Sequence, residues 1–194
     1  MQYYLGIDQS KRCTGCVLLN ENGIMVDYLL ICESVLDNEQ LIVSQFATMC
    51  AWLERTLEED DKLFAMIEGL AFGAVGSGKD FLAGLQWYFR TRFMILYNHL
   101  GTVPVSMWRS KVLSKDEQRE AKAEGKDGLK WAVFNKLPAH VRKQFADYVE
   151  EHKDAINAAK TGAKKGSTSK KYVDGMMDLS DAYYIAHFCL SINK

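Results

Sequence analysis

Four carboxylates, spread over almost the whole chain, have the chemistry and spacing of a divalent-metal site. Asp8 follows an apolar segment, Glu68 ends another, and Asp178 and Asp181 stand three residues apart where the last helix is expected to begin. Carboxylates near apolar surface cost free energy unless they are paired or bind a metal. Hard oxygen ligands suit Mg²⁺ or Mn²⁺, and two such ions can activate a water and stabilise a leaving oxygen in phosphodiester cleavage. We therefore interpret the four residues as catalytic metal ligands.

Each carboxylate also has a purely structural interpretation. Asp8 fits a turn after a strand, and Glu68 fits a cap on the glycine-rich segment that follows it. Asp178 and Asp181 fit the N-cap and N3 positions of a helix, where negative charge is favourable. The same spacing puts both carboxylates on one helix face, so the pattern alone leaves both interpretations open.

The elements that position these residues alternate in a way typical of α/β proteins. Apolar, partly β-branched segments predict strands, and apolar positions at helical spacing predict helices. The predicted strands are 2–7, 13–19, 24–31, 62–68 and 103–105, and the main predicted helices are 38–59, 80–99 (with Asp80 as N-cap) and 178–192. The turn signal at 20–23 joins two of the strands as a hairpin. This order predicts a mixed five-stranded sheet, three antiparallel strands and then parallel strands, with helices on both faces.

The segment between 110 and 172 differs from the rest of the chain. Predicted helices at 114–124, 128–136 and 139–160 alternate there with polar breaks, and a flexible composition follows up to Lys171. From Arg109 to Tyr172 there are 16 Lys and Arg against 9 Asp and Glu, although the whole chain has a net charge of -1. We predict one domain over residues 1–194 with a basic helical insertion at about 110–172. A basic segment is either a solvated face or a surface that binds nucleic acid.

Composition excludes several other classes. The content is ordinary for a globular protein, with 48% apolar and 25% charged residues. No apolar run reaches the roughly 18 residues that a membrane span needs, and no signal peptide is recognisable. We therefore expect a cytoplasmic protein without a membrane partner, whose five cysteines are reduced. Gly73, Gly78 and Lys79 approach a P-loop, but Asp80 stands where Ser or Thr should bind Mg²⁺, so no nucleotide cofactor is expected.

Three motifs together resemble the RuvC-type Holliday-junction resolvases of the RNase H-like nuclease superfamily. The segment Gly6–Gly15 resembles the opening strand of that family, with Asp8 at its acidic position. Ile67 and Glu68 resemble the second signature, and Asp178, Asp181 and Ala182 resemble the third. The resemblance covers about residues 1–110 and 173–194, and the strand order is also that of the superfamily.

The resemblance implies a homodimeric endonuclease that cleaves four-way DNA junctions by paired, symmetric nicks. It implies two Mg²⁺ ions per site, with Mn²⁺ as a substitute, and a dimer formed through the 80–99 helix. It also suggests that Phe72 enters the junction, that Lys79 contacts a phosphate, and that Lys111 and Lys130 are catalytic or phosphate-contacting lysines. The complete set of expected DNA-binding residues is Phe72, Lys79, Arg109, Lys111, Lys130, Lys164, Lys165, Lys170 and Lys171.

Two departures from the family pattern widen the alternatives. Gln9 and Ser10 replace the Pro-Gly usual after the first Asp, and about 110 residues separate Glu68 from Asp178. This divergence suggests a phage or other mobile-element protein, active in a bacterial host cell. The alternatives are an RNase H-like nuclease acting on RNA–DNA hybrids or branched DNA, a non-catalytic DNA-binding module, and an actin-like or sugar-kinase-like ATP-binding protein.

Overall fold

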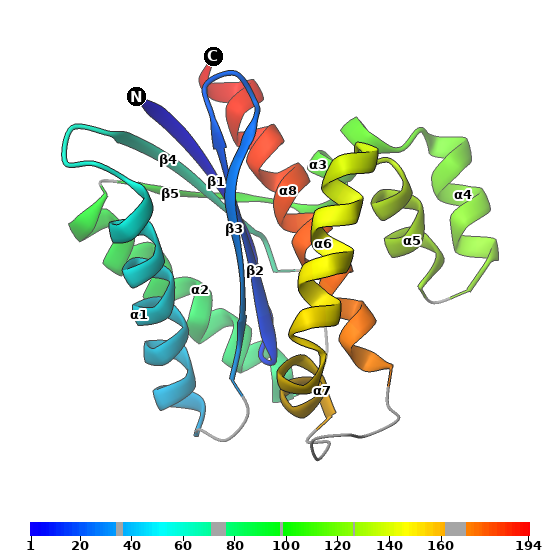
Figure 1. Cartoon of the computed structure of the whole chain (residues 1–194), viewed down its shortest axis with the longest axis horizontal. Helices are drawn as coiled ribbons and strands as arrows, with labels where there is room; N and C mark the ends of the chain where they lie inside the picture. The colour runs from blue at the N-terminus through cyan, green and yellow to red at the C-terminus, as the bar shows by residue number, and fades with distance from the viewer. Residues whose placement is uncertain (34–36, 71–76, 98, 126, 162–169) are drawn as a thin grey trace.

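The computed structural model describes six ranges of the chain, and within them the five strands form one mixed sheet (Figure 1). The described residues are 1–33, 37–70, 77–97, 99–125, 127–161 and 170–194. The strands are β1 (Gln2–Asp8), β2 (Cys13–Asn20), β3 (Met25–Cys32), β4 (Lys62–Glu68) and β5 (Leu100–Val103), in the order β3-β2-β1-β4-β5. β1, β2 and β3 pair antiparallel, whereas β4 runs parallel to β1 and β5 parallel to β4. The predicted mixed sheet is confirmed.

Helices cover both faces of this sheet. They are α1 (Asn38–Thr56), α2 (Ser77–Leu96), α3 (Val105–Val112), α4 (Lys115–Ala123), α5 (Gly128–Asn135), α6 (Ala139–Glu151), α7 (Lys153–Thr161) and α8 (Asp174–Asn193), with a short 3₁₀ helix at Lys171–Val173. One apolar core lies between the sheet and α1 and α2, and a second lies between the sheet and α8 with α3, α5, α6 and α7. Figure 1 shows α1 and α2 on one side of the strands and α8 and α6 on the other.

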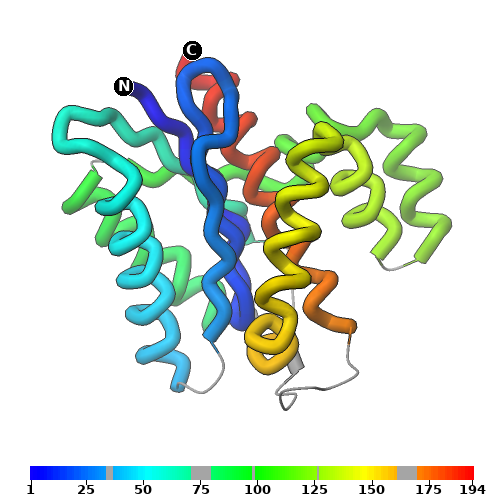
Figure 2. Tube along the Cα trace, viewed as in Figure 1, coloured from blue at the N-terminus to red at the C-terminus, as the bar shows by residue number. Residues whose placement is uncertain are grey.

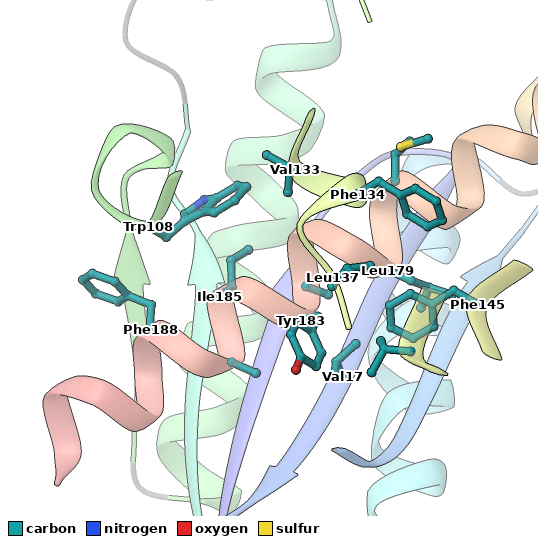
Figure 3. Packing of buried hydrophobic residues seen from close by; sticks show 14 of the residues in the cluster. Val17, Trp108, Val133, Phe134, Leu137, Phe145, Leu179, Tyr183, Ile185 and Phe188 are labelled. Atoms are coloured by element: carbon teal, nitrogen blue, oxygen red, sulfur yellow. The ribbon is translucent and has the colours of Figure 1, made fainter. Parts of the chain in front are cut away.

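The second core is built around α8 (Figure 3). Leu179 and Ile185 of α8 pack with Trp108 of α3 and with Val133 and Phe145 from α5 and α6. Buried residues occur around most of the circumference of α8. Because α8 lies between the sheet and the helices α3, α5 and α6, polar side chains on it are held away from water.

Several boundaries differ from the predicted ones. α2 begins at Ser77, so Asp80 lies inside its first turn and the prediction of Asp80 as N-cap is wrong. The predicted 139–160 helix is two helices, α6 and α7, separated at His152. α8 begins at Asp174, one turn earlier than predicted, so Asp178 is not its N-cap. The last predicted strand is shifted, since Pro104 caps α3 and β5 ends at Val103.

Both chain termini lie at the same end of the molecule (Figure 2). β1 starts there and runs toward the opposite end of the sheet, where Asp8 is its last residue. None of the helices in the described ranges is long and apolar enough to cross a membrane.

Candidate active site

Asp8 and Glu68 lie at the same edge of the sheet because they end neighbouring parallel strands. Ile7 of β1 is paired with Ile67 of β4, so the next residue of each strand is one of the two acids. Side chains alternate between the faces of a strand. Tyr4 of β1 and Met66 of β4 belong to the core beneath α8, so Asp8 and Glu68, at even spacing from them, are directed to the same face.

Two glycines bring α8 against this edge. A Cβ atom on Gly6 would lie 2.0 Å from the carbonyl oxygen of Ala182, and one on Gly15 would lie 2.5 Å from that of Asp178. The α8 backbone therefore rests directly on β1 and β2, which only residues without a side chain allow. Asp8 is opposite Gly15 in the β1–β2 pairing, so this contact brings the second turn of α8 to Asp8.

The four predicted carboxylates are thus brought together at one end of the sheet. Asp8, Asp178 and Asp181 are all buried. Burial raises the pKa of Asp8 well above its ordinary value, and the charges of Glu68, Asp181 and Asp178 raise it further. Burial and then the charge of Glu68 raise the pKa of Asp181 to about 7. Mutual repulsion of this kind marks a group of acids that a cation would stabilise.

Three basic side chains from three helices partly compensate these charges. Lys160 Nζ of α7 donates to Asp178 Oδ2 at 2.6 Å, and Lys130 Nζ of α5 lies 3.8 Å from Asp178 Oδ1. Arg109 Nη2 of α3 lies 3.9 Å from Asp181 Oδ2. Burial raises the pKa of Asp178, and the two lysines oppose that rise.

Glu68 also interacts with α3. Burial raises the pKa of Glu68, and Arg109 and the Trp108 indole oppose the rise. The indole Nε1 does not complete a hydrogen bond, and Glu68 Oε2 and Asp181 Oδ1 are likewise buried without a partner among the described residues. Two acceptor oxygens in this group are therefore available to a further donor or cation.

The donor set fits a hard divalent cation, although the side chains are not arranged as a finished metal shell. Among the described residues, no three acidic, histidine or cysteine side chains converge closely enough to hold one ion as they stand. Four carboxylates with two unpartnered oxygens are nevertheless the ligand chemistry that Mg²⁺ and Mn²⁺ prefer. Asp8, Glu68, Asp178 and Asp181 are the residues that would hold such an ion.

Two residues of the site were not predicted from the sequence. Lys160 was predicted at the boundary between the 139–160 helix and a flexible tail and was given no role, but it lies in the last turn of α7, one helical turn after the buried Ile156. Its place on an amphipathic helix was the available signal. Gln9 was noted only as a departure from a family pattern, yet its Nε2 donates to the backbone oxygen of Glu68 at 2.8 Å. No local pattern indicates that contact.

The predicted DNA-binding residues have different positions. Arg109 and Lys130 lie at the carboxylates, whereas Lys111 is exposed and lines a hollow beside Tyr184 and Phe188. Lys170 and Lys171 are exposed near the start of α8, and Lys171 forms an ion pair with Asp174. The remaining ones lie outside the described residues or side chains: Phe72, Lys79, Lys164 and Lys165.

The sheet order, the layered helices and the direction of the strands define an RNase H-like fold of the RuvC type. Among solved structures, the chain is similar to Thermus thermophilus RuvC in complex with a Holliday junction substrate, with a TM-score of 0.54 and 12% identity over 98% of this chain and 96% of that one. It is also similar to another T. thermophilus RuvC structure, with a TM-score of 0.51 and 10% identity over 96% of each chain. No protein-family model matches the sequence, and no curated protein matches it. At these identities the likeness concerns the fold.

Proposed function

We propose that this chain is a metal-dependent, structure-selective endonuclease that resolves four-way (Holliday) DNA junctions. The observation that carries the proposal is the convergence of Asp8, Glu68, Asp178 and Asp181 at one end of a RuvC-like sheet. Buried carboxylates that repel one another destabilise the folded state. Their presence therefore indicates a functional site. A purely structural capping role does not account for them, because Asp178 and Asp181 lie in the second turn of a buried helix.

In this proposal, the four carboxylates hold two Mg²⁺ ions, for which Mn²⁺ substitutes. Bound ions of this kind supply an activated water and stabilise the departing 3′ oxygen. The charges of all three other acids act on Asp8, so Asp8 would be among the residues that hold the ions. The packing of α8 on the sheet keeps water away from the carboxylates and strengthens their electrostatic interactions.

Two basic residues of the site would neutralise the charge of a bound phosphate. Arg109 and Lys130 reach the carboxylates from α3 and α5, where they would balance the negative charge that builds up on the scissile phosphate. Lys130 is partly exposed, so it can turn toward DNA. Lys160 is less exposed than Lys130 and lies closer to Asp178, so it orients that carboxylate.

The DNA surface extends from the site into the basic part of the chain. From Arg109 to Tyr172, the charge balance is 16 basic against 9 acidic residues. Lysines neutralise phosphates and release counter-ions, so binding should weaken steeply with salt. We propose the set predicted from the sequence as the DNA contacts, with Arg109 and Lys130 nearest to the cleaved phosphate.

We also propose that the nuclease is a homodimer formed through α2. Paired nicks need two active sites, and α2 exposes large apolar side chains that the rest of the described chain does not cover. Trp87 and Ile95 are each 69% exposed, and Met94 is 65% exposed. Exposed apolar clusters of this kind are typical of protein interfaces.

A substrate panel tests the proposed function. Labelled four-way junction, linear duplex and RNA–DNA hybrid are incubated with the protein in Mg²⁺, Mn²⁺ or EDTA. The proposal predicts paired nicks on the junction alone, which EDTA abolishes. Cleavage of the hybrid or of every branched substrate would favour a broader RNase H-like nuclease. Tight binding without cleavage would make the chain a DNA-binding module.

A further inference from the structure

A cavity of about 750 Å³ opens at the end of the sheet opposite the four carboxylates. It lies between the last turns of α1, α2 and α8 and the first residues of β4, at the end where both chain termini lie (Figure 2). Its volume is in the range of pockets that bind ligands. Since Asp8 ends β1 at the other end of the sheet, the cavity is separate from the candidate active site.

The sheet has an open edge at this cavity. Leu100, the first residue of the edge strand β5, is paired with Ala65 of β4, whereas β4 begins three residues earlier at Lys62. The Lys62 N–H donates to the Met1 backbone oxygen at 2.9 Å, so the backbone groups of Lys62 face β1. Backbone groups of successive strand residues point to opposite sides, so those of Leu63 face the open side.

No described residue pairs its backbone with Leu63 on that side. His99, which leads into β5, donates its N–H to the Tyr97 oxygen at 3.0 Å and not to Leu63. A strand edge with unpaired N–H and C=O groups is a template for pairing with another chain. Extended peptides commonly bind by adding a strand to such an edge.

The two sides of the open edge differ in charge. Glu54, Glu58 and Glu59, which come from α1 and the loop that follows it, line the cavity and are exposed. On the side of α8, the lining includes Phe64 and Ile192. Successive side chains of a strand alternate between its faces. An added strand would therefore direct one set of side chains to the glutamates and the other set to apolar surface.

The negative charge of the lining is only partly balanced. The three glutamates form no ion pair among the described residues. Asp61 also lines the cavity, but it is paired with the N-terminal ammonium of Met1 at 2.6 Å. Lys62 supplies one positive charge to the lining. The excess of negative charge favours a cationic partner.

We propose that this cavity and the open edge of β4 bind an extended basic peptide of a partner protein, in which Lys or Arg alternates with apolar residues. The Leu63 backbone pairs with the peptide backbone, the glutamates attract its basic side chains, and the side of Phe64 and Ile192 receives its apolar ones. A small organic cation would use the glutamates but not the Leu63 backbone. The peptide site is independent of the proposed nuclease activity.

A matched pair of variants tests the place of binding. The full chain is titrated into a fluorescein-labelled hexapeptide of alternating Lys and Val, and binding is followed by fluorescence anisotropy. Glu58→Lys and Asp60→Lys make the same charge change at exposed positions of one loop, but only Glu58 lines the cavity. We expect Glu58→Lys to weaken binding by about 3- to 10-fold and Asp60→Lys by less than about 2-fold. Equal losses in both variants, or no binding of the peptide to wild type, would overturn the proposal.

Two measurements on the unaltered protein test the backbone pairing. Bound peptide should slow hydrogen exchange of the Leu63 amide, whereas the Lys62 amide, already bonded to Met1, should change less. The same hexapeptide with N-methylated backbone amides keeps its charges but loses its donors, so it should bind more weakly. Unchanged Leu63 exchange, or equal binding of the N-methylated peptide, would show a site for cations alone and overturn the proposal.

Discussion

Replacing Lys160 by Met tests whether the ion pair between Lys160 and Asp178 stabilises the folded protein. Lys160 Nζ bonds to Asp178 Oδ2 at 2.6 Å, and the two side chains are only 12% and 5% exposed. Attraction by Asp178 raises the pKa of Lys160 against the opposing effect of burial, so the lysine is charged at neutral pH. Methionine keeps a similar length and removes the charge, which leaves Asp178 as a buried carboxylate with a weaker partner.

The expected cost follows from the geometry. Breaking a buried ion pair by removing one partner costs about 3–5 kcal/mol. Lys130, at 3.8 Å from Asp178 Oδ1, remains and compensates part of the charge. Asp178 also has a raised pKa, so it can take up a proton instead of remaining charged. We therefore expect a loss of about 2–3 kcal/mol in the free energy of unfolding at pH 8, which lowers Tm by roughly 4–12 °C in a chain of this size.

The pH dependence has a definite sign. Without Lys160, the pKa of Asp178 rises further above its unfolded value, so the folded variant binds more protons than the unfolded chain. The destabilisation is then present above that raised pKa and is lost as the pH falls through it. Tm of wild type and variant should therefore differ at pH 8 and approach each other at pH 5.

The assay is thermal unfolding without metal at both pH values. Lys153→Met is the control, because Lys153 and Glu150 form an exposed pair that contributes little. A Lys160→Met Tm equal to that of the control at pH 8 would refute the reasoning, as would a loss of the same size at both pH values.

Three further predictions concern packing, pH and assembly. Gly15→Ala places a Cβ 2.5 Å from the Asp178 carbonyl oxygen, so it should destabilise the fold by about 1–3 kcal/mol and weaken Mn²⁺ binding. Gly84→Ala, whose Cβ meets only a side-chain methyl at 3.4 Å, should match or exceed the wild-type Tm. Asp181 has a pKa raised to about 7, so metal-free stability should fall as the pH rises through 7, and less so in Asp181→Asn. Trp87→Glu should yield a folded monomer by light scattering, because Trp87 is 69% exposed on the single chain; a persistent dimer would contradict the α2 interface.

The sequence predicts the sheet well because each strand carries its own local signal. Asp8 and Glu68 end apolar runs, and parallel neighbours end at one edge, so their proximity follows from the strand order. The start of α8 was predicted one turn late because Asp178 and Asp181 have the composition of a helix N-terminus. Met176 and Met177 continue the helix in front of them, and packing against the sheet overrides that local signal.

Contacts between distant parts of the chain could not be predicted from the sequence. Lys160 reaches Asp178 only because α7 packs against the 3₁₀ helix that leads into α8. The Gln9 amide bonds to a backbone oxygen 59 residues further along the chain. Neither contact has a periodic or compositional signature, since each depends on how helices and strands are placed in space.

Asp8→Asn tests most directly whether the four carboxylates form a catalytic metal centre. Asp27→Asn is the matched control, because Asp27 accepts a hydrogen bond from Trp52 on the other face of the sheet and an Asn oxygen can also accept it. Nicking of a labelled four-way junction in Mg²⁺ and binding of the same junction in EDTA are measured for both variants. We expect that Asp8→Asn loses nicking and binds the junction at least as tightly as wild type, while Asp27→Asn retains both activities. Wild-type nicking by Asp8→Asn would contradict it.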